Sequence, residues 1–133
     1  MNELFSTAWM SELQNRWNAS EEIVVPLAEA GFSARIGYGF KGDENPHGLL
    51  VIENGVVTHA GEYDGGPLDW DLRADPDTWF EWINGGFGLT KLGPAVATGA
   101  LQFVTGNYRQ MIRNPALANP FLHHFSLMHE VGV

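Results

Sequence analysis

The sequence predicts an α+β protein with helices near both ends of the chain and strands between them. Apolar residues recur every four positions before residue 20 and every two positions after residue 32, which are the repeats of helix and strand. Residues 1–31 are therefore expected to form a helical lead, and residues 32–133 to hold the sheet, its crossover helices and a C-terminal helix. With 133 residues, the chain is expected to be one domain with a buried core.

Two helices are expected in the lead. Ser6 is a suitable cap for the first helix, because its hydroxyl can accept from a free backbone amide. Glu21 and Glu22 suit the positive end of a second helix, which Pro26 should kink or break before Gly31. One face of the first helix carries an N-terminal stripe, consisting of Phe5, Trp9, Leu13 and Trp17.

Five strands are expected after the lead. Residues 32–40 alternate between apolar and other side chains, and Asn54-Gly55 predicts a tight hairpin turn between the runs 49–52 and 56–60. Residues 68–73 alternate again, and a last strand should contain Leu101 and Phe103.

The second half of the chain predicts further helices. Asp75 and Pro76 favour a helix start, and Gly85-Gly86 should end that helix. A short helix is expected after Pro94, and another from 108 to 113. The last helix is expected to begin at Asn119-Pro120 and to share one apolar face among Phe121, Phe125 and Met128.

Composition excludes several classes of function. Sixteen acidic residues against seven basic ones give a net charge of −9, which disfavours nucleic acid as a partner. The absence of cysteine removes disulfides, thiolate metal sites and cysteine nucleophiles. No stretch is apolar enough to predict a membrane span, and the start of the chain does not have the pattern of a signal peptide. A cytoplasmic protein without a cofactor is expected.

The motifs that suggest chemistry have simpler interpretations. Glycines from 37 to 42 match a dinucleotide loop in spacing, yet they fall in a predicted strand followed by acidic residues. Asp69 and Asp71 are interpreted as a solvated strand face rather than as a catalytic pair. His123, His124 and His129 lack the spacing of three or four that ligands on one helix face need. No catalytic residue and no metal ligand is predicted.

Several short segments occur in an order that resembles one known family. These are Trp9 to Leu13 with Asn18-Ala19-Ser20, then residues 51–57 around the hairpin turn, Trp82 to Gly85, residues 94–101 and Thr105-Gly106-Asn107. The whole order is similar to that of the sterol-carrier-protein type-2 (SCP-2-like) lipid-binding domains. The resemblance covers nearly the whole chain. It implies a five-stranded, mostly antiparallel sheet, covered on one face by helices, with an apolar tunnel between sheet and helices. The density of tryptophan, with Tyr38 and Tyr63, departs from the family and could narrow the tunnel.

The function expected is non-enzymatic binding and carrying of an apolar or amphipathic molecule, such as a fatty acyl chain, an acyl-CoA, a sterol-like or an aromatic lipid. Glycines in the second half leave gaps between large side chains, and methionine adapts to irregular apolar shapes. Residues 120–133 are a candidate lid. The predicted tunnel residues are Trp79, Trp82, Phe87, Leu89, Leu92, Phe103, Met111, Phe121, Phe125 and Met128.

Two other functions remain open. The first is an accessory subunit that docks on an enzyme, or on its own copy as a homodimer, and exposure of the N-terminal stripe would favour it. The second is a small enzyme for an apolar substrate, with His59, Tyr63 or Asp64 as proton-transfer groups facing a cavity.

Overall fold

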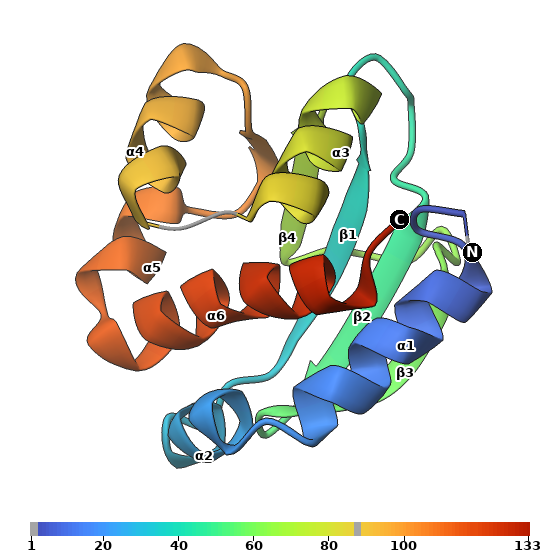
Figure 1. Cartoon of the computed structure of the whole chain (residues 1–133). Coiled ribbons are helices and arrows are strands. Elements are labelled where there is room, and N and C mark those ends of the chain that lie inside the picture. Colours follow the sequence, from blue (N-terminus) through green and yellow to red (C-terminus); the bar gives the residue numbers. More distant parts are fainter. Residues whose placement is uncertain (1–2, 87–88) are drawn as a thin grey trace.

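The computed structural model describes residues 3–86 and 89–133, and Figure 1 shows helices packed in front of one twisted sheet. In chain order the elements are α1 (Thr7–Asn18), α2 (Glu21–Glu29), β1 (Ala34–Phe40), β2 (Gly48–Glu53), β3 (Val56–Glu62), β4 (Trp70–Ala74), α3 (Pro76–Gly85), α4 (Leu89–Thr98), β5 (Gln102–Thr105), α5 (Tyr108–Arg113) and α6 (Pro115–Val131).

The five strands form one sheet in the order β3-β2-β1-β4-β5. β1 pairs with β4 in parallel, whereas the other three neighbouring pairs are antiparallel. The predicted α+β class with a mostly antiparallel five-stranded sheet, covered on one face by helices, is therefore confirmed (Figure 1).

The hairpin between β2 and β3 has the turn that its sequence predicts. Asn54 and Gly55 have φ angles of 49° and 85°, so both occupy the left-handed region that a two-residue hairpin turn requires. Gly55 also lies against α2, where an added Cβ would be 2.6 Å from the backbone nitrogen of Ala28. This position therefore needs glycine for two separate reasons.

Helix α1 is capped at its first end and hydrogen-bonded to the sheet at its last. The Ser6 hydroxyl accepts from the backbone amide of Trp9 at 3.2 Å, which confirms the predicted cap. The Asn18 side chain accepts from the amide of Val57 and donates to its carbonyl, at 2.9 and 3.0 Å. Asn18 thus occupies backbone groups of the edge strand β3 that another strand would otherwise use.

Three prolines lie inside helices, and the predicted helix starts after Pro94 and at Asn119-Pro120 were wrong. Pro26 does not break α2, Pro94 lies within α4, and Pro120 lies within α6, which begins at Pro115 instead. The cap of α6 is Asn114, whose side chain accepts from the amide of Ala116. In α2 and α6, burial of apolar residues on both sides of the proline offsets the lost backbone hydrogen bond.

The face of the sheet opposite the helices is covered by loops, and this overturns the interpretation of Asp71 as solvated. Pro46 packs on Gly39, where an added Cβ would lie 2.8 Å from its Cα atom. Beneath this cover Asp71 and Arg73 are 5% and 4% exposed and form a bidentate ion pair at 2.6 and 3.0 Å. Arg73 also donates to the carbonyls of Phe40 and Asp43. Asp69, in contrast, is exposed as expected.

The C-terminal segment is part of the core rather than a detachable lid. α6 packs on α1, α2 and α3, and it crosses in front of the sheet in Figure 1. Phe125 and Met128 are buried, and the carbonyl of Gly132 accepts from the indole nitrogen of Trp9 at 2.7 Å. Deleting residues 120–133 would therefore remove core side chains. Among the residues described, no helix has the length and apolar character needed to cross a membrane.

Candidate apolar pocket

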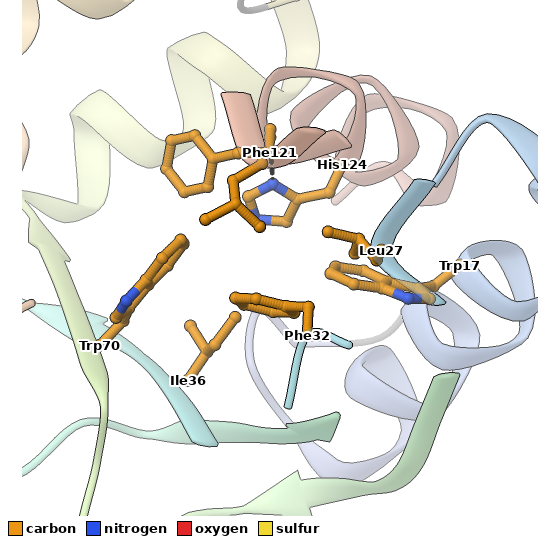
Figure 2. A pocket seen from close by; sticks show the side chains of 8 residues that line it. Trp17, Leu27, Phe32, Ile36, Trp70, Phe121 and His124 are labelled. Carbon is orange, nitrogen blue, oxygen red and sulfur yellow. Dashed lines mark hydrogen bonds between the residues drawn. The ribbon is translucent and has the colours of Figure 1, made fainter. Parts of the chain in front are cut away.

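An apolar pocket lies between α6 and the sheet, and Figure 2 shows its side chains converging from several elements. α6 supplies one wall through Leu117, Phe121 and His124, which are four and three positions apart and therefore share one helix face. Ile36 and Trp70 form the opposite wall and are direct neighbours in the register of β1 and β4. The full lining consists of Trp17, Leu27, Phe32, Ile36, Trp70, Leu117, Phe121 and His124.

The pocket is nearly filled by its own side chains. Its free volume is about 10 Å³, which is about the room that one water molecule needs. Trp70 packs edge-on against Phe32 and Phe121, with ring centres 5.6 and 5.5 Å apart. An open tunnel, as expected from the resemblance, is not seen within the described residues. Binding of any ligand larger than water therefore requires these rings to move.

The exposure of the lining residues shows where the pocket opens. Phe32, Trp70 and Leu117 are half-buried, whereas the other five lining side chains are buried. The half-buried residues come from the segment before β1, from β4 and from the start of α6. They form the mouth of the pocket, so movement of Leu117 or Trp70 would open it to solvent.

His124, the titratable residue of the lining, is hydrogen-bonded to the buried Tyr38, which does not itself line the pocket. The Tyr38 hydroxyl lies 3.1 Å from Nε2 of His124, and Nδ1 of His124 contacts the carbonyl oxygen of Phe121. A carbonyl oxygen can only accept, so Nδ1 carries the proton and donates to it. Nε2 then accepts from the Tyr38 hydroxyl. Both imidazole nitrogens are therefore satisfied without a ligand.

Burial keeps this pair neutral. The pKa of His124 is lowered to about 4, mainly by burial; the hydrogen bond to the Phe121 carbonyl acts against this shift, and the nearby His123 adds to it. Burial also raises the pKa of Tyr38 above its ordinary value. At neutral pH the pocket therefore presents aromatic and aliphatic surface without a charge, which suits an apolar guest.

The predicted tunnel residues lie mostly in the core around the pocket. Phe121 lines it directly, and Phe103 contacts Phe121 and Trp70 with ring centres 6.0 and 6.4 Å apart. Phe87 lies outside the described residues, as does the side chain of Leu89, the first residue of α4. The others are buried in the core without lining the pocket, namely Trp79, Trp82, Leu92, Met111, Phe125 and Met128.

Sequence reasoning missed seven of the eight lining residues. Trp17 and Ile36 belong to apolar faces that the sequence predicts. The spacing of apolar residues on such a face indicates that the side chains are buried, but it does not indicate which other side chains they contact. His124 was considered only as a possible metal ligand, an interpretation that was rejected, and its neighbour Tyr38 is 86 positions away in the chain. The clearest available signal was the spacing of Leu117, Phe121 and His124, which places them on one helical face.

The residues expected to serve an accessory subunit or a small enzyme do not lie where either function would require them. The N-terminal stripe is buried, so it offers no exposed docking surface. His59 and Asp64 are exposed, and neither they nor Tyr63 line the pocket. Within residues 3–86 and 89–133, no group of three histidine or carboxylate side chains is arranged to hold a metal ion.

The fold and the pocket define a small α+β protein with one helix-covered sheet and an apolar, aromatic-lined interior. Its fold is that of sterol carrier protein 2, whose crystal structure matches 98% of this chain and 100% of its own length with a TM-score of 0.76 and 20% identity. A conserved hypothetical protein from Thermus thermophilus matches 98% of this chain and 90% of its own at 20% identity, with a TM-score of 0.69.

A third solved structure, a UbiJ-SCP2 ubiquinone synthesis protein, matches 93% of this chain and 88% of its own, with 14% identity and a TM-score of 0.59. No protein-family model matches the chain, and neither does any curated protein. The resemblance seen in the sequence is therefore confirmed at the level of fold.

Proposed function

We propose that the protein binds and carries an apolar small molecule, without chemical conversion, between α6 and the sheet. The observation that carries the proposal is the pocket itself, whose lining is aromatic and aliphatic except for His124, a residue with both ring nitrogens already hydrogen-bonded within the protein. The fold agrees, since solved structures with this architecture include sterol carrier protein 2.

Entry of the ligand requires the mouth to open. Leu117 and Trp70 are half-buried and can turn toward solvent, although Trp70 then gives up its ring contacts with Phe32 and Phe121. The predicted tunnel residues Phe125 and Met128 lie further along α6, and we infer that a long guest would reach them by displacing Phe121. Each methylene that it buries contributes up to about 0.8 kcal/mol, so a long chain could offset the displaced contacts.

The pocket also restricts what the ligand can be. The lining offers no charged side chain, because His124 is neutral at physiological pH. An ionised group in the interior would therefore be left without a counter-ion, which is costly. We infer that a fatty acyl or aromatic lipid would bind with its apolar part inside and any ionised head at the mouth.

The test uses two matched tryptophan substitutions on α6. Leu117→Trp fills the mouth of the pocket, whereas Leu122→Trp makes the same change at a half-buried position of the helix that does not line it. Binding of an anthroyloxy-labelled stearate should weaken about tenfold or more in Leu117→Trp, equivalent to about 1.4 kcal/mol, and remain within about threefold in Leu122→Trp.

Gentle-ionisation mass spectrometry of the purified protein provides the second readout. An apolar molecule that travels with the wild-type protein, and is lost in Leu117→Trp, would support the pocket as its site. The proposal fails if the labelled stearate does not bind to the wild type and no apolar molecule accompanies it. Equal loss of binding in Leu117→Trp and Leu122→Trp would argue against this pocket in particular.

A further inference from the structure

Charge is divided unequally along the chain. Residues 82–129 contain no aspartate or glutamate and three basic residues, although the whole protein has a net charge of −9. The remainder therefore holds all sixteen acidic residues against only four basic ones. A separation of this size favours a less negative electrostatic potential over the part of the surface that these residues form.

The fold gathers the basic residues of this run at one end of the molecule. Lys91, Arg109 and Arg113 lie on α4 and α5 and are all exposed. Among the described residues none of the three forms an ion pair, whereas Arg16, Arg35 and Arg73 each pair with a carboxylate. Figure 1 shows α4 and α5 at the left of the molecule and α1 at the right. Residues 89–113 are called the acid-free end below.

The acid-free end also carries apolar surface in a groove. The groove has a volume of about 600 Å³ and is formed by α4, β5 and α5. Val104 lies in it with 60% of its surface exposed, which is more than any other large apolar side chain described. Phe103 and Tyr108 are half-buried there, and Arg109 belongs to the same lining. Apolar, aromatic and cationic side chains thus meet on one surface.

We infer that the acid-free end docks on an anionic lipid surface. Unpaired basic side chains would contact the phosphates, while Val104 and the Tyr108 ring would enter the interfacial region, where amphipathic rings are favoured. Asp69 and Asp71 lie next to Gly106 and Thr105 at this end, but the Asp71 carboxylate is paired with Arg73. Acidic residues further from the contact than about 8 Å are largely screened at physiological salt.

The groove adjoins the mouth of the pocket. Phe103 lines the groove and contacts Trp70 and Phe121, which line the pocket. A protein docked through the acid-free end would therefore hold the mouth close to the lipid. The docking itself does not depend on the proposed ligand, so vesicle binding tests it separately.

The experiment compares full-length variants on vesicles of phosphatidylcholine alone and of equimolar phosphatidylcholine and phosphatidylglycerol. Arg109→Gln with Arg113→Gln removes two charges from the acid-free end. Arg16→Gln with Lys41→Gln removes the same net charge elsewhere and serves as the control. Each basic residue strengthens binding roughly fivefold at low salt, so the first pair should weaken binding to anionic vesicles about 25-fold and the control less than about threefold.

Co-sedimentation measures the bound fraction, and circular dichroism confirms that both variants fold. Val104→Ser should weaken binding without changing its dependence on salt, because it alters only the apolar contact. The inference is overturned if the wild type binds both kinds of vesicle equally, or if the control pair loses as much binding as the first. Binding to soluble polyglutamate without binding to anionic vesicles would also overturn it, in favour of an acidic protein partner.

Discussion

The buried pair of His124 and Tyr38 makes the stability of the protein depend on pH in a defined window. His124 has a pKa of about 4 in the folded protein and an ordinary value of 6.5 when unfolded. Between these two pH values His124 is protonated in the unfolded chain and neutral in the folded protein. The stabilising contribution is therefore complete above about pH 6.5 and is lost as the pH falls towards 4.

The magnitude follows from the same two values. The difference between 6.5 and about 4 corresponds to about 3 kcal/mol in the free energy of unfolding. This is a large part of the 5–15 kcal/mol or so that a domain usually has. Other carboxylates and histidines titrate on acidification too, so the contribution of His124 must be isolated by a variant.

The double variant His124→Leu with Tyr38→Phe removes both polar side-chain groups together, and the Phe121 carbonyl that loses the His124 N–H lies inside helix α6. Urea unfolding at several values between pH 7 and pH 4, followed by fluorescence, gives the free energy of unfolding for each protein. The wild type should lose about 3 kcal/mol more than the double variant over this range. Parallel pH profiles for the two proteins would refute the assignment of a depressed pKa to His124.

Two further predictions concern stability at neutral pH. Asp71→Ala should destabilise the protein by about 3–5 kcal/mol, measured by urea unfolding, because it leaves the buried Arg73 guanidinium without its partner. A loss below about 1 kcal/mol would mean that water reaches this pair. Asn18→Ala should cost about 1–3 kcal/mol, since the Val57 amide loses its acceptor while the Val57 carbonyl keeps only its hydrogen bond from Gln14, and hydrogen exchange at the Val57 amide should accelerate. An unchanged exchange rate there would contradict the role of Asn18 at the sheet edge.

Local patterns were sufficient for most of the elements. The alternation in residues 34–40 and the Asn54-Gly55 turn each specify their structure through nearest neighbours, since side-chain direction and φ preference act within a few residues. The same holds for the caps at Ser6 and Asn107, which both accept from amides three positions ahead.

Proline positions show where local reasoning was insufficient. Asn114-Pro115 and Asn119-Pro120 are both acceptable helix starts in the sequence, and the structure uses the first. The early start places Leu117 in the pocket lining and Ala118 in the buried core. A preference of this kind is decided by tertiary packing, which can exceed the cost of a missing backbone hydrogen bond.

By itself the sequence determined that apolar side chains at regular intervals must be buried, and therefore which segments are helices and strands. The tertiary structure alone decided which of these side chains meet. Asp71 is covered because a loop folds over the back of the sheet, and the pocket exists because α6 brings Leu117 and His124 over Ile36 and Trp70. The periodicity of apolar residues predicts that a side chain is buried, but which residues it contacts depends on how segments far apart in the chain pack together.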